Sequence, residues 1–150
     1  MTEREVEMIQ LRLGIIGCGN IVSRAHIPAL SEFPGVKVIA LADPVDERLK
    51  KVGDQLGITD LYSDYKDLVA LDNLDAVVVC APNCEHASAS IAALQAGKHV
   101  LCEKPIAMTF DEAKEIAKAA GKSGKIFLPG MNNRFRSESL FIKRQIENGI

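Results

Sequence analysis

The chain has 150 residues, of which 47% are hydrophobic and 25% are charged, and this composition excludes a disordered tail. The length allows one domain with its own core but no second full domain. Eighteen Lys and Arg residues against twenty Asp and Glu residues give a net charge of −2 without a basic run, which argues against nucleic acid as a partner.

The sequence carries no sign of a targeting segment or a membrane span. Residues 1–7 hold three glutamates, where a signal peptide needs positive charge followed by an apolar run. No apolar stretch approaches the roughly 18 residues that a membrane span requires. We therefore expect a cytoplasmic protein that has no membrane partner.

The first part of the chain alternates short apolar runs with stretches of helical periodicity. Residues 11–16 predict a strand buried on both faces, and a helix is expected from about Asn20. Residues 36–42 predict a second strand. Apolar residues then recur at helical spacing over residues 45–56 until Gly57 ends the helix.

The middle of the chain continues this alternation. A short segment at residues 61–62 and a helical stretch over residues 64–71 precede residues 75–80, the most strand-like run, which we place in the centre of the sheet. The next helix should end at Gly97, before a fifth strand over residues 99–102. The apolar face of that helix is predicted to consist of Ala87, Ile91 and Leu94.

The last part contains two more helices and one more strand. Thr109 and Glu112 have the spacing of a capping box that opens a helix, which we expect Gly121 to close. A sixth strand is predicted over residues 126–128 and a final helix over residues 137–148. The core-facing residues are predicted to be Phe110, Ala113, Ile116, Ala117 and Ala120 in the first helix, and Leu140, Ile142 and Ile146 in the second.

Strands that alternate with helices favour a parallel sheet, because parallel neighbours need crossover connections and these are right-handed. We therefore predict an α/β fold, a doubly wound Rossmann-type parallel sheet of about six strands with helices on both faces. In such a sheet, ligands bind at the carboxyl ends of the strands.

A glycine-rich turn follows the first predicted strand and could bind a diphosphate at the start of the next helix. The residues of this turn are Gly17, Cys18, Gly19, Asn20 and Ile21. Val22 stands where the fingerprint prefers Gly or Ala for close helix packing, so this third requirement is not met. A turn that binds no ligand is the alternative.

Asp43 ends the second predicted strand, where a carboxylate can accept hydrogen bonds from an adenosine ribose. Its charge would repel a 2′-phosphate, so we expect NAD as the cofactor, with NADP less favoured. Because Asp43 precedes Pro44, it could instead cap the following helix, and the two roles are compatible.

Polar residues follow the later strands, at residues 80–83, 102–105 and 130–134. Lys104 is the most informative of them, because a lysine beside a hydride acceptor can bind a substrate hydroxyl and stabilise the alkoxide formed on oxidation. Taken alone, Lys104 is better interpreted as a surface lysine in an ion pair.

Three motifs resemble the Gfo/Idh/MocA family, which includes glucose-fructose oxidoreductase and inositol dehydrogenase. They are residues 13–21, the Pro-Asn-x-x-His loop at residues 82–86 and the Glu-Lys-Pro signature at residues 103–105. The resemblance covers almost all of the chain after residue 10. It implies an NAD-dependent dehydrogenase that acts on a sugar, an inositol or a related polyol, and that is a homo-oligomer when intact.

The resemblance also implies roles for individual residues. Lys104 would be the catalytic residue that contacts substrate and nicotinamide, Glu103 would lie near the nicotinamide ribose, and the Lys104–Pro105 bond is expected to be cis. Arg134 and Asn132 would lie at the cleft, beside cofactor and substrate respectively. The loop implied to lie along the dinucleotide comprises Cys80, Ala81, Pro82, Asn83 and His86. The histidine of that loop could alternatively fix only the start of its helix.

Family members continue into a second, mostly antiparallel domain that shapes the sugar pocket and supplies further acid-base groups. We therefore expect an N-terminal extension at residues 1–10, an NAD-binding domain at residues 11–136, and a helix at residues 137–150 that leads towards a second domain not present in this sequence. The chain alone is then expected to be inactive. The rival interpretations are a non-catalytic NAD-binding or scaffold module and, with less support, a methyltransferase.

The remaining cysteines and histidines have simpler interpretations. Cys18, Cys80 and Cys102 would all lie near strand ends but lack the spacing of metal ligands, so we predict free thiols and no metal site. His26 is expected to pack or to lie on the surface, and His99 to be structural.

Overall fold

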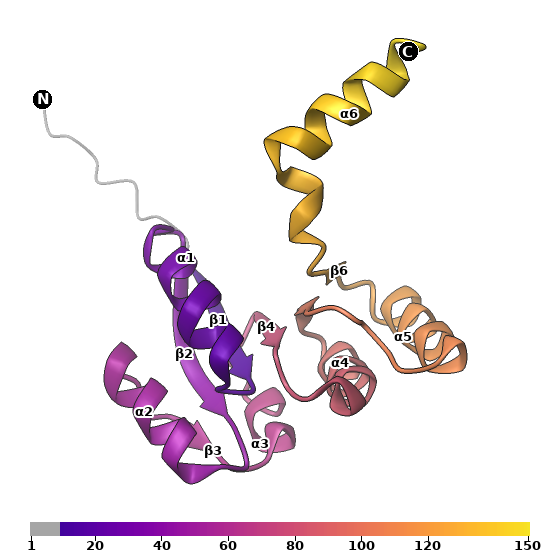
Figure 1. Cartoon of the computed structure of the whole chain (residues 1–150). Helices are drawn as coiled ribbons and strands as arrows, with labels where there is room; N and C mark the ends of the chain where they lie inside the picture. Colours follow the sequence, from indigo (N-terminus) through magenta and orange to yellow (C-terminus); the bar gives the residue numbers. More distant parts are fainter. Residues whose placement is uncertain (1–9) are drawn as a thin grey trace, which may run out of the picture.

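Six parallel strands form one sheet in the order β3-β2-β1-β4-β5-β6. The computed structural model describes residues 10–150 (Figure 1), so most of the expected N-terminal extension lies outside the described residues. The strands are β1 (Leu11–Ile16), β2 (Val36–Ala42), β3 (Leu61–Tyr62), β4 (Ala76–Val79), β5 (His99–Cys102) and β6 (Phe127–Pro129). The predicted α/β fold is confirmed. Strand order reverses between β1 and β4, which opens a crevice at the C-terminal ends of these strands.

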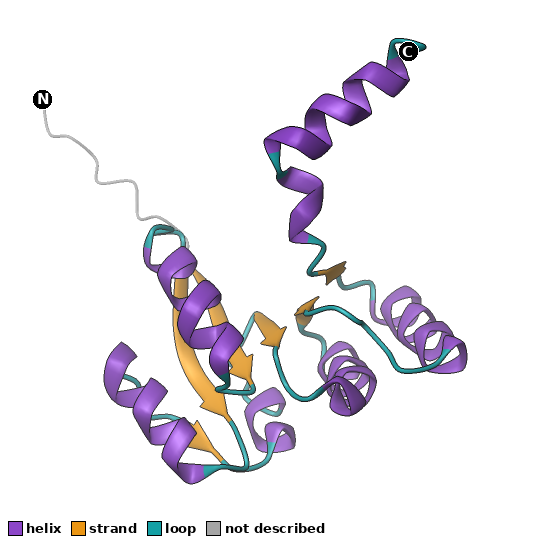
Figure 2. Ribbon diagram, viewed as in Figure 1, coloured by secondary structure: helices purple, strands orange, loops and turns teal. Residues whose placement is uncertain are grey.

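Helices connect the strands, as Figure 2 shows. They are η1 (Val22–His26), α1 (Ile27–Ser31), α2 (Asp46–Leu56), α3 (Tyr65–Val69), η2 (Asn83–Glu85), α4 (His86–Gln95), α5 (Phe110–Ser123), η3 (Asn132–Phe135) and α6 (Ser137–Glu147). η1 is a π-helical stretch that runs directly into α1, and η2 and η3 are 3₁₀ helices. No helix among residues 10–150 is both long and apolar enough to cross a membrane.

Alternate residues of each strand point to opposite faces, so the sheet buries two separate apolar clusters. On one face, β4 residues Val77 and Val79 pack against helices α3, α4 and α5 through Leu68, Leu94 and Ile116. On the other face, the cluster contains Ile15 and Val78 with Val22, Ile27 and Leu49 from η1, α1 and α2. The helices on the two faces hold the strand ends that form the crevice.

The predicted apolar face of α5 is partly wrong. The capping box between Thr109 and Glu112 forms as expected, but Phe110 is 76% exposed and Ala117 is also exposed. Ile116 and Ala119 are the buried residues of this helix, because the helix turns a narrower stripe towards the sheet than the periodicity indicated.

The predicted end of α5 is also wrong. The helix continues through Gly121 to Ser123, and Gly124 ends it in the left-handed conformation with φ 65°. Gly121 has no positive φ and a Cβ there would meet no atom within 4 Å, so this glycine neither requires nor produces a helix end.

The final helix forms, but its apolar residues do not face the core. Leu140, Ile142 and Ile146 are 41%, 58% and 67% exposed. Figure 1 shows the reason, because η3 and α6 lead away from the sheet rather than along it. The prediction of a buried face is therefore wrong, because the chain after β6 runs away from the sheet.

Among residues 10–150, no helix covers β5 and β6 on the sheet face opposite α4 and α5. An apolar hollow of about 420 Å³ lies there, and its lining includes Val78, Leu101, Ile126 and Leu128. Ile126 and Leu128 are 65% and 54% exposed. The part of the chain that the structure describes thus leaves an apolar sheet surface open to solvent.

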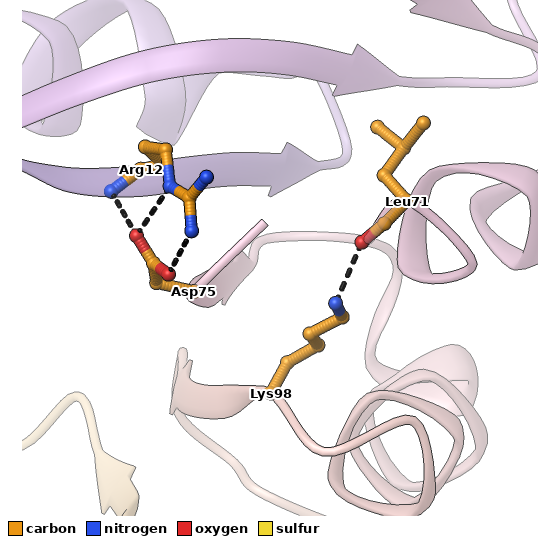
Figure 3. Close-up of polar contacts among 4 residues, drawn as sticks. All are labelled: Arg12, Leu71, Asp75 and Lys98. Carbon is orange, nitrogen blue, oxygen red and sulfur yellow. Dashed lines mark hydrogen bonds and ion pairs between the residues drawn. The ribbon is translucent and has the colours of Figure 1, made fainter. Parts of the chain in front are cut away.

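Charged side chains connect neighbouring segments at the N-terminal ends of the strands (Figure 3). Arg12 donates from Nε and Nη2 to the two carboxylate oxygens of Asp75 at 2.9 and 2.7 Å, and its backbone N–H donates to the same group at 2.8 Å. Lys98 is 7% exposed, and its Nζ donates to the carbonyl of Leu71 at 2.6 Å. These bonds join β1 to the start of β4 and fix the α4–β5 connection on the segment after α3.

Candidate functional site

The turn after β1 requires glycine at its first position. Gly17 has a φ of 93°, its N–H donates to the carbonyl of Ala42 at 2.7 Å, and a Cβ there would lie 2.6 Å from backbone atoms of Cys80 and Ala81. Both the left-handed backbone and the neighbouring strand end therefore exclude a side chain. The turn is packed between the ends of β2 and β4.

The second glycine of the turn faces open space. A Cβ on Gly19 would meet no atom within 4 Å, so the surface of the turn is free for close approach of a ligand. Val22 does not obstruct this opening, because its side chain is fully buried in the cluster with Ile15 and Leu49. The carbonyl of Gly19 accepts the N–H groups of Val22 and Ser23, which start the helical segment close to the predicted position.

Asp43 connects the end of β2 to the turn after β1. Its Oδ2 accepts the N–H of Cys18 at 2.7 Å, and its Oδ1 accepts the N–H of Val45 at 2.8 Å. Val45 is itself the N-cap residue of α2, and no side chain caps this helix. The structure therefore does not show the alternative in which Asp43 caps this helix, since Asp43 accepts the N–H of Val45 in a local turn before the helix. The residue is 6% exposed, so its carboxylate is held rigidly beside the glycine turn.

Two hollows lie near the glycine turn, and Asp43 lines the larger of them. The larger, about 500 Å³, is mostly apolar and its lining includes Asp43, Pro44, Tyr65, Pro82 and Cys84. The smaller, about 240 Å³, lies between the glycine turn and α2; its lining includes Gly19, Asn20, Ser23, Arg48 and Lys51. Arg48 lines both hollows. A flat apolar group could thus lie beside the Asp43 carboxylate and an anion beside the glycine turn, with Arg48 bordering both.

Glu103 follows β5 and is held by its neighbours. Its Oε1 lies 2.9 Å from Nε2 of His26, and its Oε2 accepts the N–H of Lys104 at 3.2 Å. The Lys104–Pro105 bond is cis, as expected. Lys104 is exposed, and no bond from its Nζ to another group is found within residues 10–150. The ammonium group of Lys104 is thus available to a ligand at the strand ends.

His86 begins α4 and is 2% exposed. Its Nε2 lies 2.8 Å from the carbonyl oxygen of Ala81, and its Nδ1 lies 2.6 Å from that of Pro105. Both ring nitrogens are therefore engaged with the two loops that follow β4 and β5. This geometry favours the alternative in which the histidine fixes local structure.

The three buried cysteines cannot readily act as thiolates. Burial, with the charge of Asp43, raises the pKa of the Cys18 thiol to about 12. Burial also raises the pKa of Cys80 and of Cys102. All four cysteines are free, and residues 10–150 contain no group of three or more His, Cys, Asp or Glu side chains placed to hold a metal ion.

The structure does not bring Asn132 and Arg134 to the glycine turn. Both are exposed on η3, and neither lines the hollows beside Asp43. Only the start of this segment is close to the site, because the N–H of Gly130 donates to the carbonyl of Cys102 at 2.7 Å. Ile21 and Asn83 lie at the rim and are exposed. The structural role expected for His99 is confirmed, since its Nδ1 accepts the N–H of Ile126 at 3.1 Å.

Sequence reasoning missed His26, Arg48 and Lys51. Arg48 and Lys51 lie on α2, the helix that follows Asp43, and their three-residue spacing places them on one side of it. This spacing could have indicated two basic side chains beside the glycine turn. No local pattern relates His26 to Glu103, because the two are 77 positions apart in sequence.

A family model described as an oxidoreductase family with an NAD-binding Rossmann fold matches residues 11–131. Among similar proteins, the myo-inositol 2-dehydrogenase of Thermotoga maritima is 32% identical over 139 residues, which are 93% of this chain and 41% of that enzyme. The chain thus spans about two fifths of the length of this relative.

Two solved structures share the fold. The WlbA dehydrogenase from Bordetella pertussis, in complex with NADH and UDP-GlcNAcA, has a TM-score of 0.87 at 30% identity. The matched region is 93% of this chain and 42% of the WlbA chain. A variant of a 3-ketoreductase from Actinomadura kijaniata, in complex with TDP-benzene and NADP, has a TM-score of 0.85 at 30% identity, over 94% of this chain and 43% of its own.

Proposed function

Because the chain belongs to the Gfo/Idh/MocA family of oxidoreductases, we propose that residues 11–136 bind a nicotinamide dinucleotide at the C-terminal ends of the strands. The observation that carries this proposal is the preformed turn after β1. Asp43 accepts the N–H of Cys18, while Gly19 faces open space, so the turn is held in place and its surface is accessible. The family model and the crevice between β1 and β4 support the same cofactor class.

In this proposal, each part of the dinucleotide has named partners. The turn at residues 17–21 faces the diphosphate, which takes N–H groups other than those of Gly17 and Cys18, because these two are bonded to Ala42 and Asp43. Asp43 accepts the ribose hydroxyls, and the larger hollow beside Asp43 holds the adenine. Residues 80–83 lie along the dinucleotide, with Pro82 at the adenine hollow, and Glu103 accepts hydrogen bonds from the nicotinamide ribose. These residues fit the group, since a carboxylate oxygen that accepts one N–H still has lone pairs for a hydroxyl.

Lys104 is proposed to polarise the reacting carbon–oxygen bond of a sugar, inositol or related polyol. A bound nicotinamide supplies the hydride acceptor. The Lys104 ammonium group donates a hydrogen bond to the substrate oxygen and stabilises the negative charge that develops on it. The backbone N–H of Lys104 donates to the Glu103 carboxylate, and this hydrogen bond fixes the backbone from which the Lys104 side chain projects. Asn132 and Arg134 are proposed to lie at the substrate side of the cleft, because η3 follows Gly130, whose N–H donates to the carbonyl of Cys102 next to Glu103.

The intact protein is proposed to be a homo-oligomer with a second domain, reached through α6. The relatives named above are more than twice as long as this chain, which supports a division of labour between cofactor binding and substrate binding. Within that division, residues 137–150 are the linking helix.

NAD is the proposed cofactor, because the buried Asp43 carboxylate would lie next to a 2′-phosphate and repel it. Arg48 and Lys51 oppose this preference, since they line the adjacent hollow and could partly neutralise a phosphate. Calorimetric dissociation constants for NAD and NADP compare the two effects directly. A lower value for NAD is expected, and equal values would contradict the preference.

The variant Gly19→Ala tests the binding site itself. Its methyl group meets no protein atom within 4 Å, so the fold should be unaffected, but the group would occupy the surface that the diphosphate approaches. We expect NAD binding to weaken by at least about tenfold in calorimetric titration. Gly121→Ala, which is equally unhindered and lies on α5, serves as the matched control and should bind NAD like the wild type. Equal affinity of both variants would overturn the assignment.

A further inference from the structure

We propose that His26 is a positioning residue, which holds the Glu103 carboxylate in place and thereby sets the affinity for the nicotinamide half of the dinucleotide. This inference rests on the proposed function, in which Glu103 lies beside the nicotinamide ribose. The bond between them links two elements that contact different parts of the cofactor in that proposal, since His26 belongs to the helix that starts at the diphosphate-binding turn and Glu103 follows β5.

The bond between these residues spans the two halves of the sheet. Nε2 of His26 lies 2.9 Å from Oε1 of Glu103, and the two side chains are only 16% and 19% exposed. A carboxylate only accepts, so the ring donates from Nε2. At the opposite, N-terminal ends of the strands, a hydrogen-bonded ion pair between Arg12 and Asp75 connects β1 and β4. Polar side chains therefore cross-link the two halves of the sheet at both ends of its strands, and one of the two links lies in the candidate site.

Besides the bond to His26, two further contacts restrict the Glu103 side chain. Its Oε2 accepts the N–H of Lys104 at 3.2 Å. On the other side lies Gly130, where a Cβ would come within 3.3 Å of the Glu103 Cα and 3.5 Å of its Cδ. The backbone after β6 can thus pack closely on Glu103 because position 130 lacks a side chain. With His26 in place, the carboxylate presents its remaining lone pairs in one direction.

The local helix geometry places His26 where it can reach Glu103. Residues 22–26 form a π-helical stretch, and His26 is its last residue. Such widened turns are frequent at functional sites, because they rotate the following side chains relative to a regular helix. Val22 at the start of the stretch is fully buried, so the helix is anchored on the sheet while His26 points to the strand ends.

Two substitutions separate positioning from general support of the fold. His26→Leu keeps an apolar volume but removes the donor, whereas His26→Gln can place an amide N–H near the position of Nε2. Dissociation constants are measured calorimetrically for NAD and for ADP, which lacks the nicotinamide half. We expect His26→Leu to weaken NAD about tenfold, with ADP unchanged within about twofold, and His26→Gln to restore most of the loss.

A structural role would weaken both ligands together, and that outcome would overturn the proposal, as would unchanged NAD affinity in His26→Leu. If the leucine variant does not fold, His26→Asn replaces it, because this polar side chain is too short to reach the carboxylate. Failure of wild-type protein to bind either ligand would instead contradict the proposed function. If the wild type binds ADP but His26→Leu binds NAD as tightly as the wild type, only the positioning role is contradicted.

Discussion

The two carboxylate oxygens of Asp43 each accept one backbone N–H, from Cys18 and from Val45. The residue therefore contributes to the fold and to the proposed ribose site through the same atoms. Its burial keeps the carboxylate from moving towards solvent, so a ligand meets it in the orientation that the two amides impose. Preorganisation of this kind lowers the ordering cost of binding.

The variant Asp43→Ala tests both contributions. It removes the ribose acceptor and leaves the Cys18 N–H without a partner, so we expect NAD affinity to fall at least about tenfold, or about 1.4 kcal/mol. The free energy of unfolding should fall by about 1–3 kcal/mol, because a buried donor becomes unsatisfied. Calorimetry and urea denaturation measure the two effects. Asp60→Ala removes the same charge from an exposed position and should change neither, and an unaltered NAD affinity in Asp43→Ala would remove the ribose assignment.

Individual residues differ in how far local sequence could identify them. Gly17, Asp43 and the Lys104–Pro105 bond belong to short motifs, and each lies where its motif indicated. His26 could not be assigned, because its partner Glu103 is 77 positions away and meets it only once β1 and β5 lie in one sheet. The carboxylate bonds of Asp43 to backbone amides were equally invisible, since they depend on how the turn after β1 meets the end of β2.

Strands β1 and β4 are joined by the Arg12–Asp75 pair at their N-terminal edge (Figure 3). The side-chain and backbone hydrogen bonds from Arg12 lower the pKa of Asp75 from 3.8 to about 2. A carboxyl group whose pKa is lower in the folded state stabilises the fold when it is ionised. The stabilisation is therefore complete above the unfolded pKa and is lost as the pH falls towards about 2.

The variant Asp75→Asn should accordingly be less stable than the wild type at neutral pH, and the difference should shrink as the pH falls through the window between 3.8 and about 2. Urea denaturation at a series of pH values measures this difference. Asp72→Asn lies in an exposed position on the same edge and should show no such dependence. A difference that stays constant down to the lowest pH would show that the ion pair is not its cause.

Helix α5 shows how the end of an element depends on backbone conformation rather than on residue type. Gly121→Ala should raise the free energy of unfolding by up to about 1 kcal/mol, because alanine has the higher helix propensity and finds open space there. Gly124→Ala should lower it by about 1–2 kcal/mol, because this position needs a left-handed backbone with φ 65°. Thermal and urea denaturation compare the pair, and equal effects would contradict the observed helix end.

Periodicity predicted most elements, because a strand or helix buried on the sheet must repeat its apolar residues with the period of its backbone. It failed where burial does not follow from the element alone. The apolar residues of α6 have helical spacing, yet Leu140 and Ile146 are exposed, since the direction of the chain after β6 decides what they meet. Likewise, Phe110 continues the apolar pattern of α5, but its ring is exposed and lies under the Lys114 ammonium, 4.4 Å from the ring centroid.

At the scale of the whole molecule, the described residues leave two apolar surfaces without cover. One is the sheet face over β5 and β6, with Leu128 and Ile126 more than half exposed, and the other is the apolar side of α6. Contiguous exposed apolar surface of this kind promotes association in water. β6 is also an edge strand, whose unpaired backbone groups can accept a further strand.

We therefore expect the 150-residue chain to associate in a concentration-dependent manner, as measured by sedimentation velocity. Leu128→Glu places a charge in the open sheet face and should shift the population towards monomer, because charged edges and faces oppose further pairing. Gln55→Glu adds the same charge on the exposed side of α2 and should leave association unchanged. A wild-type chain that sediments as a single monomer at all concentrations would contradict the expectation that these exposed apolar surfaces drive association.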